Sequence, residues 1–163
     1  MSTIPGYSGG MTNPRWLDAA QQDAWRAYLR MQGRLSARLN RQLQSDSGLS
    51  LADFDVLVQL TDVPDARVRV SELARALQWE KSRLSHHIGR MERRGLVARE
   101  ECQDDGRGQF VVLTPAGRTA IESAAPPHVD TVRRLVFDDL TPEQLSTLAA
   151  ISDQVLRRLA AEE

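Results

Sequence analysis

Two short helical segments joined by a tight turn, with a hairpin directly after them, are the feature of this chain that most restricts its fold. Ser71 is expected to cap the first helix, whose buried positions recur at helical spacing: Leu73, Ala74 and Leu77. A break at about Gln78–Trp79 leads into a second helix over residues 80–94, whose inward positions are Leu84, Ile88, Met91 and His87. This order is a helix-turn-helix pattern.

The segments on either side of this pair have the character of strands. Residues 97–101 alternate, QDDGRG at 103–108 forms a turn, and residues 109–113 alternate again or run apolar, which predicts a hairpin with a Gly-rich, charged tip. The alternating RVRV before Ser71 predicts a further short strand. A helix-turn-helix followed directly by a hairpin is the order of a winged helix.

Longer helices are expected outside this region. One amphipathic helix from Arg15 to about Gln44, roughly 30 residues, exceeds what a small domain needs to cover its core. A shorter helix follows, with Ser50 as N-cap and Asp53 three residues later. Thr114-Pro115 opens another helix, which Pro126-Pro127 is expected to kink. A capping box at Thr141–Gln144 opens the last helix, with an apolar stripe at Leu145, Leu148, Ser152, Val155 and Leu159. The fold class is therefore mainly α (α+β), and residues 1–14 form a flexible arm.

Composition limits the class of protein. The chain has 163 residues, 41% hydrophobic and 26% charged, which is ordinary for a soluble domain. Its net charge of −1 hides an asymmetry, since residues 65–118 carry eleven basic and eight acidic groups while residues 119–163 carry four and eight. One cysteine, Cys102, excludes an intrachain disulfide. Without an apolar run of membrane-spanning length, a cytoplasmic protein with no membrane partner is expected.

The outward face of residues 80–94 differs from an ordinary solvated helix, which favours Glu–Lys pairs. Short hydroxyl and imidazole side chains lie near its N-terminus and arginines toward its C-terminus, an arrangement that suits insertion into a DNA major groove. Taken alone, an arginine-rich surface helix is an equally good interpretation. The sequence context favours DNA, because one helix precedes this segment and a hairpin follows it. The hairpin carries Arg107, which lies between two glycines and can reach a minor groove.

Other chemistries find little support. His86 and His87 point about 100° apart on a helix and cannot easily share one metal ion, although a composite zinc site with His128 and Cys102 stays open as a weaker alternative. No phosphate-binding loop, HExxH or GxSxG motif is present, so neither an enzyme nor a cofactor is expected. Cys102 follows two glutamates, which would raise the pKa of its thiol and favour a packed role.

Over about residues 15–160 the chain resembles the MarR family of bacterial winged-helix regulators. The resemblance rests on MERRGLV at the end of the second helix, on Asp105-Gly106-Arg107 in the hairpin and on LTPAG at the next helix. It implies DNA contacts by Ser82, Arg83, Ser85, His86, Arg90 and Arg107, with Asp105 orienting Arg107 or the turn. Lys81, on the same outward face of the helix, completes the predicted DNA-binding set. It also implies a homodimer in which residues 15–48 and 116–163 interlock, while residues 49–115 form the DNA-binding domain.

The function expected from this resemblance is that of a repressor. Each winged helix would address half of a pseudo-palindromic operator in double-stranded DNA, and a small phenolic or anionic effector would release the dimer. Two alternatives remain. One is a redox-responsive regulator acting through Cys102, although peroxide-sensing members carry their cysteine near the first helix, where this chain has none. The other is a winged helix that binds an acidic protein partner.

Overall fold

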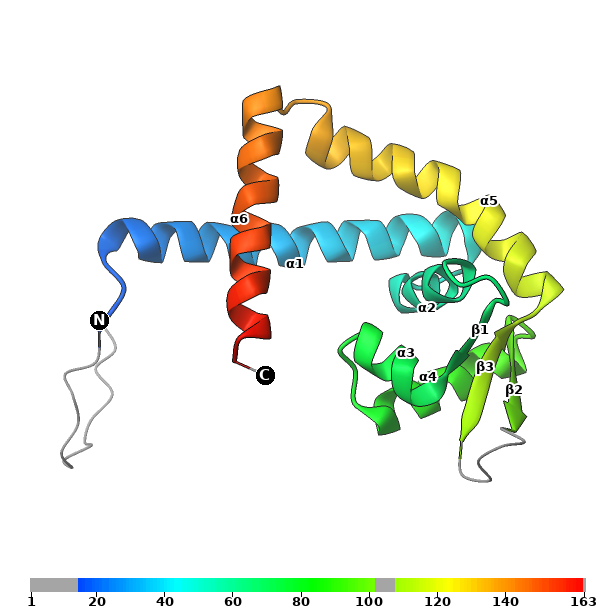
Figure 1. Ribbon diagram of the computed structural model, residues 1–163. Coiled ribbons are helices and arrows are strands. Elements are labelled where there is room, and N and C mark those ends of the chain that lie inside the picture. The colour runs from blue at the N-terminus through cyan, green and yellow to red at the C-terminus, as the bar shows by residue number, and fades with distance from the viewer. Residues whose placement is uncertain (1–14, 102–107, 163) are drawn as a thin grey trace, which may run out of the picture. The chain divides into compact units, whose positions relative to one another are not determined.

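The computed structural model describes residues 15–101 and 108–162, and it divides into two compact units, Met1–Leu35 and Ser36–Glu163 (Figure 1). Helix α1 (Ala19–Ser47) contributes to both units. It begins later than Arg15 because Asp18 and Gln21 cap it reciprocally: the Gln21 N–H donates to Asp18 Oδ1 at 2.8 Å and the Asp18 N–H donates to Gln21 Oε1 at 3.1 Å. It ends before Gly48, whose φ of +68° suits glycine.

Helix α2 (Leu51–Thr61) begins with the expected capping box. The Asp53 N–H donates to Ser50 Oγ at 3.0 Å, and the Ser50 N–H donates to Asp53 Oδ2 at 2.9 Å. The Leu51 N–H donates to Asn40 Oδ1 at 2.9 Å, which joins the start of α2 to the end of α1. Four orphan donors at a helix start need such partners, so this corner is fixed by local chemistry.

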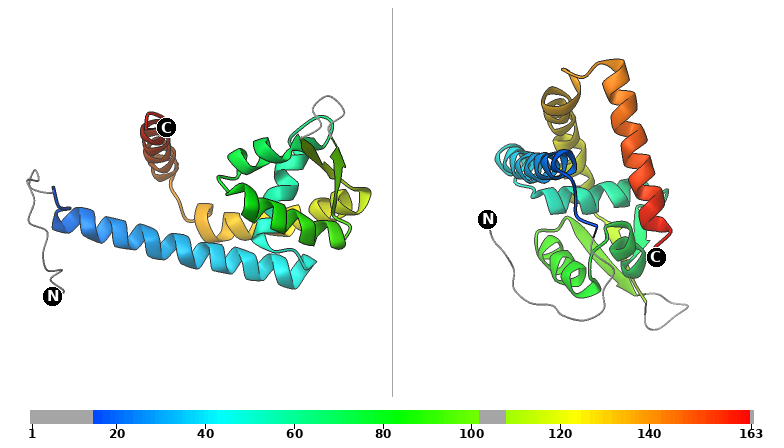
Figure 2. Two further views of the ribbon diagram at one scale, coloured as in Figure 1. Left: turned by 90° about the horizontal axis from the view of Figure 1, so that it is seen from below. Right: turned by 90° about the vertical axis from the view of Figure 1, so that its left-hand side faces the viewer.

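The predicted winged helix is present. Strands β1 (Arg67–Arg69), β2 (Val97–Glu101) and β3 (Gln109–Leu113) form an antiparallel sheet in the order β1-β3-β2, with Val68 opposite Val111 and Arg99 opposite Val111 from the other side. Helices α3 (Val70–Ala76) and α4 (Lys81–Arg93) form the helix-turn-helix beside it (Figures 1 and 2). The hairpin tip lies outside the described residues.

The start of α3 differs from expectation. Its N-cap is Arg69, without a side-chain cap, and Ser71 lies inside the helix. Strand β1 runs straight into α3, because Arg69 still pairs with Phe110 in the sheet and leaves no residue between the two elements. The break between α3 and α4 lies where expected, since Gln78 has φ +54° and the Trp79 N–H donates to Ala74 O at 2.9 Å.

Helix α5 (Pro115–Val132) is joined to the hairpin by its cap. Thr114 Oγ1 accepts the Gly117 N–H at 2.9 Å and lies 3.0 Å from Leu96 O. A side chain at Gly117 would overlap the Leu96 carbonyl, which explains the glycine in LTPAG. Pro126 and Pro127 lie inside α5 without ending it, and the departure from α-helical bonding comes later, in the π-helix η1 (Arg133–Phe137).

Helix α6 (Pro142–Ala160) opens with the expected capping box between Thr141 and Gln144. None of its residues is buried. The core lies instead among α2, α3, α4, the sheet and the first turns of α5, with the end of α1 against it. Within the described residues, no helix is long and apolar enough to cross a membrane.

Candidate nucleic-acid interface

Helix α4 has two distinct faces, as its sequence predicts. Leu84, Ile88 and Met91 are fully buried, and His87 is 6% exposed. The opposite face is solvent-exposed and holds six of the predicted DNA-binding residues: Lys81, Ser82, Arg83, Ser85, His86 and Arg90. Asp105 and Arg107, the other two, lie outside the described residues, as does Cys102. The outward face thus brings together polar and cationic groups on a helix whose back is fixed in the core.

The C-terminal end of α4 is tied to α2 by Arg94. Its Nη1 lies 2.7 Å from Asp53 Oδ2, and its Nη2 donates to Gly48 O at 2.8 Å. An Arg–carboxylate hydrogen bond with one buried partner is stronger than an exposed ion pair. Arg94 therefore fixes the orientation of α4 relative to the start of α2.

Asp53 is the centre of this arrangement and is 3% exposed. Burial alone would raise the pKa of its carboxyl group, but the His87 ring nitrogen beside it and the hydrogen bonds from Ser50 and Arg94 outweigh burial and hold the pKa well below its usual range. Asp53 is accordingly a buried carboxylate at neutral pH. A buried charge of this kind requires partners, and α4 provides two of them.

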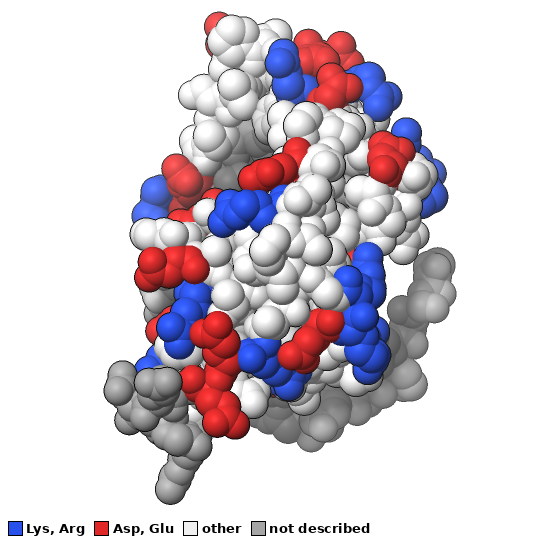
Figure 3. Space-filling model, turned by 90° about the vertical axis from the view of Figure 1, so that its right-hand side faces the viewer, with Lys and Arg blue, Asp and Glu red and all other residues white. Residues whose placement is uncertain are grey.

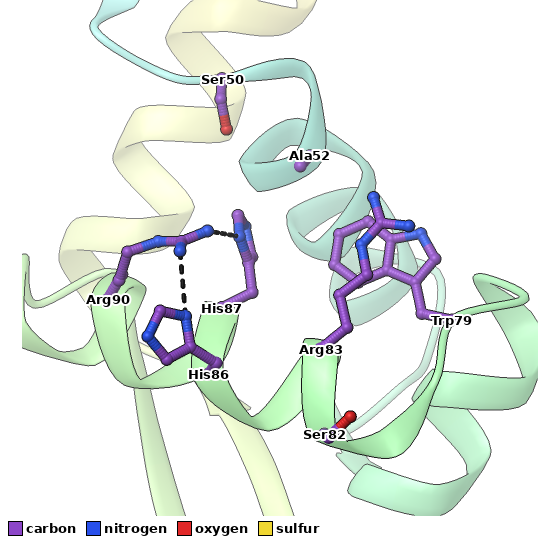
Figure 4. Close-up of a pocket in the computed structure, with 8 residues that line it drawn as sticks. All are labelled: Ser50, Ala52, Trp79, Ser82, Arg83, His86, His87 and Arg90. Atoms are coloured by element: carbon purple, nitrogen blue, oxygen red, sulfur yellow. Dashed lines mark hydrogen bonds between the residues drawn. The ribbon is translucent and has the colours of Figure 1, made fainter.

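The histidine pair divides as predicted, with His87 inward and His86 outward. His87 Nε2 lies 3.0 Å from Asp53 Oδ1, close but poorly aligned for a hydrogen bond. Arg90 joins the two rings, because its Nη2 lies 2.7 Å from His87 Nδ1 and its Nη1 lies 3.1 Å from His86 Nδ1 (Figure 4). A guanidinium has only donors, so both Nδ1 atoms are acceptors.

No cluster of three metal-ligating side chains exists among residues 15–101 and 108–162. His128, which the sequence left open as a zinc ligand, is buried far along the chain from α4, on α5. Its Nδ1 lies 3.2 Å from Gln42 Oε1, and its ring packs on Phe54 with 4.3 Å between centroids. Burial lowers the pKa of His128. Its role in this region is packing.

The sheet also contacts α4. Arg99 of β2 donates from Nη2 to the Ser85 carbonyl at 2.7 Å, and its Nε lies 3.6 Å from Glu92 Oε2. Arg67 and Arg69 of β1 lie over the Phe110 ring, at 3.9 and 5.1 Å from its centroid. The hairpin is therefore held to α4 by a side chain as well as by the core.

A pocket of about 570 Å³ opens beside the outward face of α4 (Figure 4). Its lining combines cationic, imidazole and aromatic groups: Ser50, Ala52, Trp79, Ser82, Arg83, His86, His87 and Arg90. Arg83 lies over the Trp79 ring at 4.4 Å from its centroid, and Trp79 meets His87 edge-on at 5.3 Å. Basic and aromatic groups thus surround an open space on the same surface as the predicted DNA contacts.

The charge is arranged differently on the face that lies to the right in Figure 1. There basic and acidic side chains are intermixed with neutral ones, and the described part of that face shows no broad area of one sign (Figure 3). The described part of that face therefore offers no extended cationic platform.

Sequence reasoning missed four residues that build this surface: Asp53 as an ion-pair centre, Trp79, Arg94 and Arg99. Asp53 was predicted only as the acidic member of a capping box. One signal was available, since a histidine placed on the buried face of a helix needs a hydrogen-bond partner, and the capping carboxylate of α2 is such a partner.

Comparison with known proteins agrees with this architecture. A family model described as MarR family matches residues 47–108. The DNA-bound crystal structure of Sco3205, a MarR family transcriptional regulator from Streptomyces coelicolor, is 44% identical, covering 90% of this chain and 92% of that one with a TM-score of 0.86. The chain belongs to the MarR family.

Two further relatives of this MarR family protein are also transcriptional regulators. The crystal structure of AbsC, another MarR family regulator from S. coelicolor, is 41% identical over 91% of this chain and 99% of its own, with a TM-score of 0.85. The transcriptional repressor MprA of Escherichia coli K12 is 25% identical over 82% of this chain and 75% of its own. The protein is therefore a MarR family transcriptional regulator, and family membership confirms the expectation that it is not an enzyme.

Proposed function

We propose that this MarR family regulator is a homodimeric repressor that binds a pseudo-palindromic operator, one half-site per winged helix. The outward face of α4 carries the proposal. Short polar groups at Ser82, Ser85 and His86 can approach base edges, while Lys81, Arg83 and Arg90 can reach phosphates or guanines. Asp105 and Arg107 are assigned to the hairpin contact with the minor groove, with Asp105 orienting Arg107.

The domain division follows the same proposal. Residues 1–14 are an arm, residues 15–48 and 116–163 form the dimerisation part, and residues 49–115 form the DNA-binding domain. Support comes from apolar side chains that remain exposed in each unit. In the first unit Trp25 is 52% and Met31 is 54% exposed, and on α6 Ile151 is 57% and Leu156 is 60% exposed. Exposed apolar residues in such number favour a protein partner, and a second copy of the chain is the one we propose.

Electrophoretic titration with the DNA upstream of the protein's own gene tests the DNA-binding part. A saturable complex is expected whose affinity falls steeply with salt, because cationic side chains displace counterions from the phosphates. Competition with a scrambled duplex of the same length separates sequence-specific from non-specific binding. If no salt-sensitive complex forms with any duplex, the regulator does not act through this face, and a winged helix that binds an acidic protein becomes the better explanation.

The pocket beside α4 supports the effector part of the proposal. Arg83 and Arg90 provide positive charge and Trp79 an aromatic wall, so the pocket suits a small aromatic anion. Because Arg83 and Arg90 also belong to the proposed DNA-binding set, an anion bound there would compete directly with DNA. The largest decrease in DNA affinity that the ligand can cause equals its own preference for the DNA-free protein over the DNA-bound protein.

Salicylate, a small phenolic carboxylate, is a suitable probe. It is expected to release the protein from DNA in a concentration-dependent way and to quench tryptophan fluorescence. Trp79→Leu removes the aromatic wall but none of the proposed DNA contacts, so it should weaken release by salicylate much more than it weakens DNA binding. Unchanged release by salicylate in Trp79→Leu would place the effector elsewhere, with the DNA-binding proposal unaffected.

A further inference from the structure

We propose that Asp53 and His87 are positioning residues for DNA recognition, because together they hold the guanidinium of Arg90 in one place on the outward face of α4. The inference rests on the proposed function, since it takes Arg90 to contact DNA. It assigns a role to two buried residues that are not themselves able to reach DNA. Asp53 lies at the start of α2, His87 in the middle of α4 and Arg90 in the last turn of α4; Figure 4 shows the two residues of α4.

Arg90 is exposed and would otherwise sample many rotamers. Two hydrogen bonds restrict it, from Nη2 to His87 Nδ1 at 2.7 Å and from Nη1 to His86 Nδ1 at 3.1 Å. A guanidinium carries five N–H donors, so three remain available after these two are used. The two hydrogen bonds thus fix the position of the Arg90 guanidinium, and its remaining N–H donors are available to contact DNA. A pre-oriented arginine loses less side-chain entropy when it forms a bidentate contact.

Asp53 determines whether His87 can accept from Arg90. A neutral imidazole has one donor and one acceptor nitrogen. The Asp53 carboxylate, 3.0 Å from Nε2, favours the proton on that atom and leaves the Nδ1 lone pair for Arg90. Arg94 binds the other carboxylate oxygen at 2.7 Å and fixes the plane of the group. A chain of contacts therefore runs from Arg94 through Asp53 and His87 to Arg90.

The groups around His87 leave little freedom for another arrangement. Asp53 faces it from α2, Arg90 from the next turn of α4, and the Trp79 ring meets it edge-on from the turn before α4. Arg83, which lies over Trp79, is a further cation lining the same pocket. These contacts fix the His87 ring between Asp53 and Arg90.

The experiment uses the full-length protein, a duplex that the wild type selects from a random-sequence pool, and a scrambled duplex of equal length. The specificity ratio, which is the Kd for the scrambled duplex divided by the Kd for the selected duplex, is measured at pH 8 and fixed salt. Arg90→Ala and His87→Phe are each expected to lower this ratio about tenfold. Arg93→Ala is the matched control, because Arg93 is exposed on α4 but does not belong to this chain of contacts.

A double-mutant cycle decides the point. If His87 acts through Arg90, the variant carrying both changes has the ratio of Arg90→Ala alone, whereas a purely structural role of His87 gives additive losses. His87→Phe keeps a ring against Trp79, and Asp53→Asn replaces it in the cycle if thermal melting shows that His87→Phe is unfolded. Additive losses, or an unchanged ratio in His87→Phe or Arg90→Ala, would overturn this inference while the regulator still binds DNA. Absence of any wild-type complex would instead overturn the proposed function.

Discussion

Helices α4 and α6 both carry apolar residues at helical spacing, but only α4 buries them. Leu84, Ile88 and Met91 are 0% exposed in α4, whereas Leu148 and Val155 of α6 are 40% and 51% exposed. Both stripes satisfy the same periodicity, and both helices are amphipathic. The pattern therefore identifies a face that needs a partner, but it does not say whether that partner belongs to the same chain.

Helices α4 and α6 also differ in whether their polar groups contact the core. Helix α4 provides His87 and, just past its end, Arg94 to the buried carboxylate of Asp53, and it presents a cationic face outward. Helix α6 has no buried residue. Residues 119–163, which include it, carry four basic and eight acidic groups. The buried face of α4 thus holds its outward face in position. Helix α6 instead exposes an apolar face, which we propose binds a second copy of the chain.

The largest expected effect comes from a matched pair of isoleucines. Ile88→Ala removes fully buried methyl groups from α4 and should lower the free energy of unfolding by about 2–5 kcal/mol. Ile151→Ala makes the same change at an exposed position of α6, where Ile151 is 57% exposed. Its cost should be smaller and should depend on protein concentration, because it affects association. Urea unfolding followed by circular dichroism at two protein concentrations measures both, and equal, concentration-independent losses would contradict the comparison.

Charges placed on the α6 stripe test its partner directly. Leu148→Asp combined with Val155→Asp should convert a dimer to a monomer, measured by sedimentation or light scattering. Affinity for a two-half-site operator should fall by about a hundredfold, because the second half-site is no longer held close.

Ser146→Asp is the matched control for this change. Ser146 lies roughly opposite Leu148 on the same helix, so its charge should leave the dimer intact. A dimeric mass for the doubly substituted protein, or a monomeric mass for the wild type, would rule out α6 as the dimer interface.

A smaller effect is expected from the hairpin. Arg107→Ala should weaken DNA binding about tenfold and reduce the slope of log Kd against log salt by about one unit, because one cation leaves the DNA. The mass of the dimer should not change. Arg118→Ala, which removes an exposed arginine of α5, is the control. An unchanged affinity and slope in Arg107→Ala would show that the hairpin does not engage DNA.

The parts of the fold that sequence predicted are those decided within a few residues. The caps at Ser50, Thr114 and Thr141 were predicted because each depends on a residue three positions away. The division of α4 into faces follows from its period. The cap at Asp18 is equally local, because its partner Gln21 lies three residues away. This cap explains why α1 begins later than the apolar spacing alone predicts.

The contacts that position the candidate site lie beyond such reasoning. Asp53 and Arg94 are 41 residues apart, and Arg99 and Ser85 are 14 apart in different elements. Nothing in the spacing of these residues pairs them, because the pairing depends on how α2, α4 and the sheet pack. Asp53 was therefore predicted as a cap, when it also receives His87 and Arg94.

The smallest expected effect is a pH dependence confined to the winged-helix core. His128 is buried against Phe54, and this burial lowers the pKa of His128. Its pKa is then lower in the folded state than in the unfolded state, so the unfolded chain binds more protons as the pH falls. Its contribution to stability should be complete above the ordinary histidine value of about 6.5 and should be lost as the pH falls below it.

Urea unfolding of the wild type and of His128→Asn between pH 8 and pH 5.5 measures this contribution. Asparagine stays neutral and can still donate to Gln42 Oε1, so the variant should lose less stability on acidification than the wild type. Association through the apolar stripe of α6 should not follow the same titration, because none of the residues of that helix is buried. Parallel pH curves for wild type and His128→Asn would mean that burial does not lower the pKa of this histidine in the folded protein.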